Sequence, residues 1–531
     1  MITGLLGRSW KLPPPAFAIE RVRDQSVPMR DGVNLLADVF RPVGARQPAT
    51  VLMRSPYGRG GLFIPMARIF AGQGYTTVLQ SVRGTFGSGG QFDPFFQERD
   101  DGIDTVAWIE RQPWYHGKLG LYGASYLGFV GWAIAAELGD RIAAISAAMT
   151  TSDFHASIYE GGGFRLEDYV KWISGVAMQE RTSVLVRSLK ERLFGDPIKG
   201  VYAGLPLATL DEKATGREMA FWRTWIEHDD PADPFWRPIQ NGYDMARITA
   251  PVSLVGGWSD IFIPCQARDF KAMRTQGKAT RLTLGPWTHS NFRGVGEGIR
   301  DALEWFDIHL RGHPHPAEAL DRIRVWVNGA DEWREFREWP TGTTRLSLAP
   351  NGTLTPQPHE RGQLRFTYDP NDPTPSLEGA KLGSRSGRGD MSELAARSDV
   401  LIFDGPRLEA PLELLGDISV TLTTASGSPY HDLFICLCDL GPGGKAINIT
   451  DGYKRLTPAS GDPDGRTTTV EALPVAWRLD VGHRLRLLVA GGAFPRFARN
   501  LGRGEPLATA TEGHKVDITV YCDAGTSYLS I

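Results

Sequence analysis

Residues 118–138 have the sequence KLGLYGASYLGFVGWAIAAEL, in which a short apolar run ends near Ser125 and a longer one follows. The run Lys118–Tyr122 has the length and composition of a buried strand, and Tyr126–Leu138 has those of a helix. A Gly-x-Ser between a strand and a helix is typical of a sharp turn that lifts the serine hydroxyl out of a sheet. The usual pattern is Gly-x-Ser-x-Gly, whereas the second glycine here falls one place later, at Gly128.

Short apolar runs recur on both sides of this stretch, with helix-like segments between them. The further strands that we expect are 19–24, 34–42, 50–54, 75–80, 142–145, 251–255 and 281–284. The further helices are 101–111 and 299–310. Buried strands that alternate with helices indicate a parallel α/β sheet.

Two parts of the chain depart from this alternation. Between residues 151 and 243, amphipathic patterns rich in Trp, Arg and Glu predict a helical insertion, with helices over 166–178 and 182–193. After about residue 339, runs of alternating apolar and polar residues predict an all-β sandwich. These runs are 417–423, 433–438, 483–489 and 515–521. We therefore predict four segments: an α/β core in two parts (1–150 and 244–339), a cap (151–243) and a β domain (340–531).

Composition and charge exclude several classes of protein. The chain has 531 residues, with 58 Lys and Arg against 61 Asp and Glu, and this balance argues against a nucleic-acid-binding surface. No segment approaches the roughly 18 apolar residues of a membrane span, and residues 1–15 lack the apolar run of a secretory signal. The four Cys form no CxxC pair and no disulfide framework. We expect a cytoplasmic protein with neither a nucleic-acid nor a membrane partner.

Two polar residues follow predicted strands in the order that a serine nucleophile requires. Asp260 comes shortly after the strand over 251–255, and His289 comes shortly after the strand over 281–284. In an α/β-hydrolase sheet the nucleophile, the acid and the histidine occur in this order along the chain. A serine hydroxyl needs a base, and the base needs an acid to orient it. Ser125, Asp260 and His289 are therefore the candidate catalytic residues.

Acyl hydrolysis also needs hydrogen-bond donors for the oxyanion. The backbone N–H of Tyr126, directly after the serine, is the usual first donor. Tyr57 follows the early strand over 50–54 and offers either its backbone N–H or its phenol as the second. The alternative for Tyr57 is an aromatic side chain that only packs in a loop.

Together with these residues, several motifs resemble those of the bacterial cocaine esterase-like (CocE/NonD) hydrolases. The motifs are Arg54–Tyr57, Val82–Gly84, Gly87–Phe92, Gln112–Trp114, Gly117–Gly120, Gly123–Gly128, Gly256–Trp258, Gly285–His289 and Phe494–Asn500. The wider group includes X-prolyl dipeptidyl aminopeptidases, α-amino acid ester hydrolases and glutaryl-cephalosporin acylases. The resemblance extends from about residue 19 to residue 521.

The resemblance implies an α/β-hydrolase domain, an inserted helical cap and a C-terminal β jelly roll. It implies that Ser125 is the nucleophile, that Asp260 orients His289, and that His289 acts first as base and then as acid. It also implies that the phenol of Tyr57 and the backbone N–H of Tyr126 donate hydrogen bonds to the oxyanion. This chemistry needs no metal or organic cofactor, and jelly-roll surfaces of this size often support a homodimer.

The substrate expectation rests on the residues after Asp260. Members of the group that bind an α-ammonium place carboxylates there, whereas this chain has the apolar run Ile261–Pro264. An uncompensated ammonium in an apolar pocket is costly. In cocaine esterase-like enzymes, a Phe at the second position past the Asp and a Trp in the cap help form the acyl pocket, and Phe262 and Trp172 match them. We expect a small ester substrate with an apolar or aromatic acyl group, although ordinary core packing would also explain both residues.

Other readings of the same sequence remain open. An X-Pro dipeptidyl aminopeptidase, or an α-amino acid ester hydrolase or β-lactam acylase, would need a carboxylate for the substrate ammonium. Glu160 and Asp168 in the cap are candidates for that carboxylate. A more distant alternative is an inactive binding protein that uses the β domain.

Overall fold

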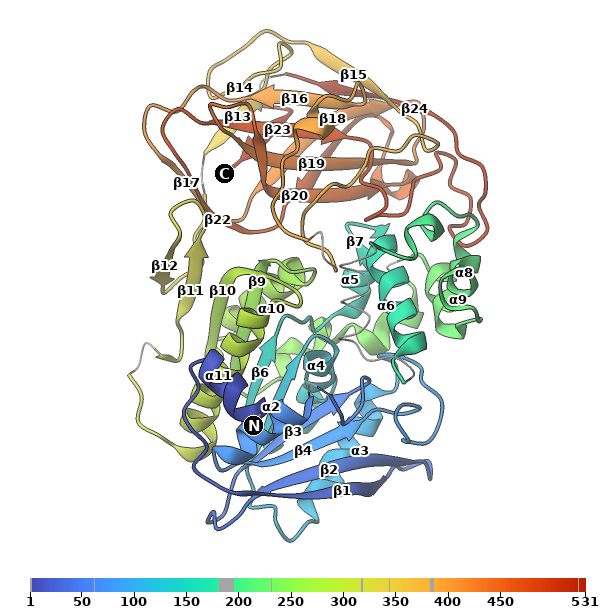
Figure 1. Ribbon diagram of the computed structural model, residues 1–531. Helices are drawn as coiled ribbons and strands as arrows, with labels where there is room; N and C mark the ends of the chain where they lie inside the picture. The colour runs from blue at the N-terminus through green and yellow to red at the C-terminus, as the bar shows by residue number, and fades with distance from the viewer. Residues whose placement is uncertain are drawn as a thin grey trace.

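The computed structural model describes residues 2–61, 63–180, 195–230, 232–316, 319–342, 344–382, 386–523 and 525–531. The helix expected over 182–193 lies outside these ranges. Figure 1 shows an α/β core below, a β domain above it in orange and red, and a mainly helical cap in green beside both. No helix in the described ranges combines the length and apolar character needed to cross a membrane.

The core is built on a ten-stranded sheet with the order β1-β2-β4-β3-β5-β6-β9-β10-β11-β12. Its strands are β1 Ile19–Pro28, β2 Asn34–Pro42, β3 Thr50–Ser55, β4 Thr76–Ser81, β5 Leu119–Ala124, β6 Ala144–Ala148, β9 Val252–Ser259, β10 Thr280–Thr288, β11 Ile323–Val327 and β12 Glu332–Phe336. Neighbouring strands from β4 to β11 pair in parallel, and the strands at both edges pair antiparallel. Every residue of β3, β4 and β6 is buried, which explains why these strands consist mostly of apolar and small residues, with Arg54 and Gln80 as the exceptions.

Helices cover both faces of this sheet. On one face α3 Glu98–Glu110, α4 Tyr126–Leu138 and α10 Ile263–Thr275 pack into one apolar core. On the other face α2 Phe63–Gly72 and α11 Phe292–Arg311 form a second core, to which Trp10, after α1 Ile2–Ser9, contributes. Eleven of the 13 residues of α4 are buried, so its sequence is apolar on every side. The predicted bounds of α4 are confirmed.

The segment between β6 and β9 forms the cap. It contains the helices α5 Phe154–Ile158, α6 Leu166–Met178, α8 Leu210–Thr215 and α9 Ala220–Glu227, and the short strands β7 Tyr159–Glu160 and β8 Gly163–Phe164. Short 3₁₀ segments occupy 199–201, 207–209, 234–239 and 241–247. The helix predicted over 166–178 is confirmed by α6. Aromatic side chains fill the cap core, among them Trp222, Trp225 and Trp236.

The β domain packs antiparallel sheets around an apolar core. One sheet contains β13 Arg345–Leu348, β14 Leu354–Thr355, β15 Gln363–Tyr368, β18 Ser419–Ser426, β21 Asp464–Glu471, β24 Val516–Tyr521 and β25 Tyr528–Ser530. The opposing sheet contains β16 Val400–Asp404, β19 His431–Leu440, β20 Ala446–Leu456 and β23 Arg484–Ala490, with β17 Leu412–Gly416 and β22 Val475–Leu479 as a separate pair and α12 Ser392–Ala395 as a short helix. The predicted β jelly-roll fold is confirmed.

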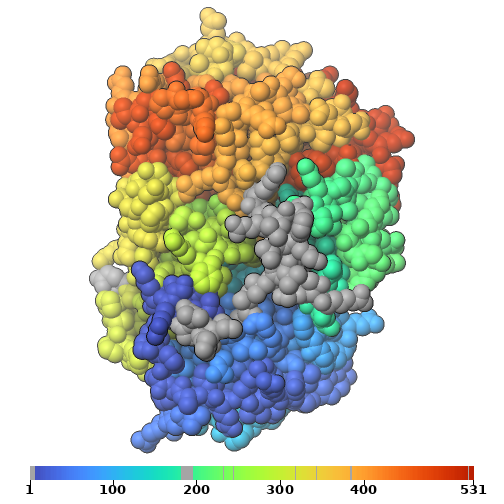
Figure 2. Space-filling view, viewed as in Figure 1, coloured from blue at the N-terminus to red at the C-terminus, as the bar shows by residue number. Residues whose placement is uncertain are grey.

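The cap is attached to the β domain as well as to the core. The backbone N–H of Ala498 donates to the carbonyl of Phe164 at 2.8 Å, and that of Arg455 donates to the carbonyl of Gly161 at 2.8 Å. Figure 2 shows the green surface of the cap against the red surface of the β domain. The cap is therefore held in place from two sides.

Candidate active site

Ser125 lies in the sharp turn between β5 and α4. Its backbone has φ 58° and ψ −129°, a conformation that is costly for any residue other than glycine. The backbone N–H of Ser125 lies 3.0 Å from the carbonyl oxygen of Ala148 and 3.1 Å from that of Met149. The Thr150 hydroxyl donates to the carbonyl of Ser125 at 2.6 Å. Hydrogen bonds to the end of β6 therefore hold the turn in its strained form.

Two glycines allow the chain to pack this tightly. A Cβ on Gly123 would lie 1.9 Å from the carbonyl oxygen of Leu127, and one on Gly128 would lie 2.5 Å from a methyl carbon of Thr150. The shifted second glycine therefore has a physical reason, because position 128 is the one that packs against Thr150. Leu127 instead points into the apolar core on the other face of the sheet.

Asp260 and His289 follow the adjacent parallel strands β9 and β10, so both lie at the same edge of the sheet as Ser125. His289 Nδ1 lies 2.7 Å from Asp260 Oδ2, and His289 Nε2 lies 3.0 Å from Ser125 Oγ. The Asp260 side chain is fully buried, whereas 14% of the His289 side chain is exposed. The structure thus brings the three candidates into one hydrogen-bonded chain across 164 positions of sequence.

The environment of Asp260 sets the orientation of the imidazole. Asp260 Oδ1 accepts the backbone N–H of Phe262 at 2.7 Å, which leaves Oδ2 for the histidine. Because an ionised carboxylate can only accept, His289 Nδ1 must donate to it. In neutral His289 the other nitrogen, Nε2, is then an acceptor and can take the proton of the Ser125 hydroxyl. The Phe262 ring packs edge-on against the imidazole at 5.4 Å.

Donors for an oxyanion lie beside the serine. Tyr126 is the first residue of α4, and the first N–H groups of a helix have no acceptor within the helix. The backbone N–H of Tyr57 donates to Ser55 Oγ at 3.0 Å. Of the two groups that the sequence offers at Tyr57, the structure therefore favours the phenol. The Trp172 indole N–H donates to that phenolic oxygen at 3.0 Å.

Comparisons with known proteins show to which family the chain belongs. Residues 31–291 match the family model of the X-Pro dipeptidyl-peptidase (S15 family), and residues 315–530 match that of the X-Pro dipeptidyl-peptidase C-terminal non-catalytic domain. The cocaine esterase of Rhodococcus sp. (strain MB1 Bresler) is 28% identical, with 91% of this chain and 92% of that protein covered. The chain belongs to the CocE/NonD family of serine hydrolases, within the S15 group.

Solved structures show the same fold. An aminopeptidase from the marine sediment archaeon Thaumarchaeota archaeon superposes with a TM-score of 0.81 at 21% identity, over 98% of this chain and 97% of that one. An α-amino acid ester hydrolase superposes with a TM-score of 0.78 at 20% identity, again over 98% and 97%. This CocE/NonD hydrolase therefore has the three-part architecture of these enzymes.

In this CocE/NonD hydrolase, aromatic side chains gather next to the candidate site. Trp172 of α6 is half-buried and stacks on Tyr126 with ring centroids 6.4 Å apart. It also contacts the rings of Phe95, Phe221 and Trp225. Phe262 also contacts Phe154, at 5.4 Å. The structure therefore places both expected acyl-pocket residues beside the catalytic candidates, Trp172 at the oxyanion donors and Phe262 at His289.

The two cap carboxylates have charged partners within the protein. Asp168 is fully buried and forms an ion pair with the buried Arg165 at 2.7 Å. Glu160 also pairs with Arg165, and it lies 3.5 Å from the buried Arg496 of the β domain. Because these carboxylates already neutralise arginines at the junction of cap and β domain, neither offers an unpaired charge to a substrate ammonium. This corrects the expectation that they are available for such a role.

Sequence reasoning missed two charged residues that lie behind this site. Arg54 and Glu98 are almost fully buried and form an ion pair at 2.9 Å. An arginine inside the otherwise uncharged strand Thr50–Ser55 is a signal that a buried acidic partner must exist, because an unpaired buried charge is prohibitively costly. Within the described ranges, no three His, Cys, Asp or Glu side chains are grouped to hold a metal ion.

Proposed function

We propose that this serine hydrolase cleaves a carboxylic ester with an apolar or aromatic acyl group, through an acyl-enzyme on Ser125. The observation that carries the proposal is the hydrogen-bonded chain from Ser125 Oγ to His289 and on to the buried Asp260. This is the arrangement in which a serine hydroxyl becomes a nucleophile. Its position at the carboxyl ends of parallel strands supports the same role.

The reaction proceeds in two halves. Ser125 Oγ attacks the ester carbonyl carbon while its proton passes to His289 Nε2, and the resulting oxyanion is bound by the Tyr57 phenol and the Tyr126 N–H. The bond to the alcohol oxygen then breaks, and the alcohol leaves with the proton from His289. A water molecule gives a proton to His289 and attacks the acyl carbon. The acid is released, and His289 returns the proton to Ser125.

The surroundings of the site support an uncharged acyl group. Phe262 presents aromatic surface to His289, and Trp172 lies against the candidate oxyanion donor Tyr57. The residues after Asp260 are apolar, and the cap carboxylates Glu160 and Asp168 are paired with arginines. Activity on a substrate with a free α-ammonium is therefore not favoured, although the archaeal aminopeptidase has the same fold.

Two chromogenic substrates test the proposal. One is an uncharged p-nitrophenyl acyl ester, and the other is an X-Pro p-nitroanilide with a free amine. We expect the wild type to cleave the ester and not the anilide, and Ser125→Ala to lose ester hydrolysis by several orders of magnitude. Ordinary turnover by Ser125→Ala would contradict the assignment of the nucleophile. Cleavage of the anilide would contradict the proposed substrate class.

A further inference from the structure

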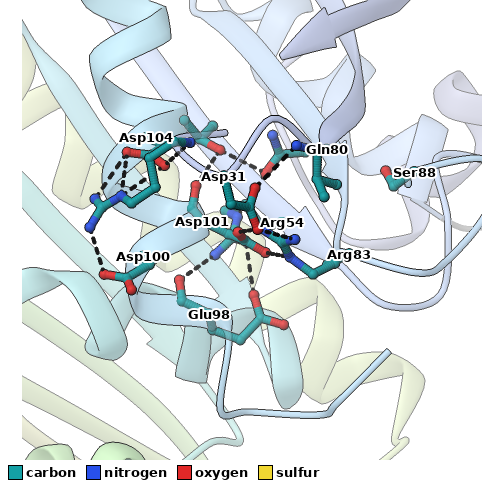
Figure 3. Close-up of polar contacts among 12 residues, drawn as sticks. Asp31, Arg54, Gln80, Arg83, Ser88, Glu98, Asp100, Asp101 and Asp104 are labelled. Atoms are coloured by element: carbon teal, nitrogen blue, oxygen red, sulfur yellow. Dashed lines mark hydrogen bonds and ion pairs between the residues drawn. The ribbon is translucent and has the colours of Figure 1, made fainter. Parts of the chain in front are cut away.

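A buried ion pair lies behind the candidate active site, between the end of β3 and the start of α3. Figure 3 shows Arg54 between Gln80 and Glu98. Arg54 Nη2 lies 2.9 Å from Glu98 Oε2, and the side chains are 1% and 3% exposed. Arg54 also donates through Nη1 to the backbone carbonyl of Glu98 at 2.9 Å and through Nε to Gln80 Oε1 at 2.8 Å.

The neighbouring ion pairs in Figure 3 differ in their exposure. Arg83 pairs with Asp101 at 2.6 Å and with the half-exposed Asp31 at 2.7 Å, so this group reaches the surface. The Arg54–Glu98 pair, in contrast, is buried on both sides of the contact. Burying two charges costs more than their attraction usually returns, so stabilisation of the fold is a weak explanation for this pair.

Glu98 has a second partner in the catalytic turn. The phenol of Tyr126 donates to Glu98 Oε1 at 2.7 Å and accepts the backbone N–H of Phe95 at 2.9 Å. Burial raises the pKa of Tyr126, so the phenol keeps its proton and remains a donor. The side chain of Tyr126 is thus fixed at its far end, while its backbone N–H lies next to Ser125.

Arg54 connects Glu98 with the segment that carries the other oxyanion donor, Tyr57. Arg54 lies near the end of β3, and the next residue, Ser55, accepts the Tyr57 backbone N–H through its Oγ at 3.0 Å. The Glu98 carboxylate therefore has two partners. It accepts a hydrogen bond from the Tyr126 phenol, and it forms an ion pair with Arg54, shortly before the loop that carries Tyr57. The two contacts come from segments that are far apart in the sequence.

We propose that Glu98 is a positioning residue for the oxyanion-binding site, which keeps the Tyr126 N–H and the Tyr57 phenol at a fixed spacing through Tyr126 and Arg54. This inference rests on the function proposed above. A misplacement of about 1 Å can cost up to a hundredfold in rate, so a rigid link of this kind has a kinetic consequence. Glu98 itself touches no reacting atom.

The main variant is Tyr126→Phe, which removes the hydrogen bonds that the phenol makes with Glu98 and with the Phe95 N–H, and which keeps both the aromatic ring and the Arg54–Glu98 ion pair. Tyr75→Phe is the matched control, because Tyr75 is also fully buried and its phenol donates to a carboxylate, Asp307, at 2.5 Å. A second variant, Glu98→Gln, removes the charge while keeping an oxygen that can accept from Tyr126.

Two kinetic readouts distinguish positioning from simple stabilisation of the fold. The first is the separate kcat and KM for the p-nitrophenyl ester. The second is the Ki of an aryl trifluoromethyl ketone, which forms a tetrahedral adduct with the serine and needs the same oxyanion donors. We expect Tyr126→Phe to lower kcat about tenfold with KM within about twofold, and to raise the Ki by a factor similar to the loss in kcat. Glu98→Gln should change both in the same direction, and Tyr75→Phe should change neither.

The outcomes separate this inference from the proposed function. One outcome is that the wild type hydrolyses the ester through Ser125 while Tyr126→Phe keeps the same kcat and Ki as the control Tyr75→Phe. In that case the positioning role is wrong and the proposed function stands. A lower unfolding temperature without a change in the Ki would likewise overturn it. If the wild type itself does not hydrolyse the ester and does not bind the ketone, the proposed function fails first.

Discussion

The indole nitrogen of Trp172, on cap helix α6, lies 3.0 Å from the phenolic oxygen of Tyr57, which follows strand β3 of the core. An indole N–H can only donate, so the Tyr57 oxygen is the acceptor in this pair. The orientation of the phenol is therefore set by a residue of the cap. Cap and core together define the position of a candidate oxyanion donor, and this relationship can be tested from both ends.

Replacement of Tyr57 by Phe tests the donor itself. We expect Tyr57→Phe to lower kcat for the p-nitrophenyl ester by about 10²–10³-fold, because one of the groups that stabilise the oxyanion is lost. The KM should change little, since the ring remains. An unchanged kcat would show that the phenol does not bind the oxyanion.

Replacement of Trp172 by Phe tests the cap side of the same contact. Trp172→Phe keeps an aromatic ring but removes the indole N–H, and we expect kcat to fall by roughly tenfold because the phenol is no longer held. In the Tyr57→Phe background the same change should have little further effect, because residues in contact are not additive. Trp225→Phe is the control, since the buried Trp225 indole N–H has no acceptor within the described part of the chain. Equal losses in both backgrounds would mean that Trp172 acts independently of Tyr57.

Much of the fold and part of the site could be predicted from local patterns. The bounds of α4 follow from the length and composition of an apolar run, those of α6 follow from an amphipathic pattern, and both agree with the structure. Asp260 and His289 were predictable because each directly follows a strand, and parallel strands bring their carboxyl ends to one edge. These inferences need only residues that are close in sequence.

The contacts that could not be predicted join segments far apart in sequence. The Arg54 side chain pairs with Glu98 across a gap of 44 positions, and nothing in the spacing distinguishes Glu98 from Asp100 or Asp101. The pairing of Asp168 with Arg165 is local, but its burial depends on how the cap packs on the β domain. From the sequence alone, Asp168 was therefore a candidate ligand for the substrate, whereas in the structure it forms an ion pair with Arg165.

Asp260→Asn tests the orientation of the imidazole. An amide at this position would present an N–H₂ or a weaker acceptor to His289 Nδ1, which favours the tautomer with its proton on Nε2. We expect kcat to fall by about 10⁴-fold, because Nε2 could no longer accept the Ser125 proton. The fold should persist, since the side chains have the same shape. Retention of more than a tenth of the wild-type kcat would contradict the role of Asp260.

Asp168→Asn tests whether the cap carboxylates are structural. The change leaves the buried Arg165 without its closest fully buried partner, and breaking a buried ion pair typically costs about 3–5 kcal/mol of unfolding free energy. Urea unfolding should show this loss, while KM for the uncharged ester in the folded enzyme stays within about twofold. Unchanged stability, together with a selective loss of activity on amine-bearing substrates, would return Asp168 to the binding site.

His155 makes the stability of the cap sensitive to acid. It lies on α5, 5% exposed, with its ring against Tyr159 and Trp236. Burial lowers the pKa of His155 from its ordinary value of 6.5 to about 4; Arg268 adds to this, and Asp230 opposes it. Between these two pH values the folded protein binds fewer protons than the unfolded chain. The contribution of His155 to stability is therefore fully present above pH 6.5 and is lost as the pH falls towards 4.

His155→Phe should remove this dependence, because phenylalanine fills the aromatic site and takes up no proton. Between pH 6.5 and 4, the unfolding free energy of the wild type should fall more steeply than that of the variant. One proton accounts for a difference of at most about 1.4 kcal/mol per pH unit. Urea unfolding at pH values across this window measures both slopes. Parallel curves would mean that His155 takes up no proton on unfolding in this range, and that other groups carry the acid sensitivity.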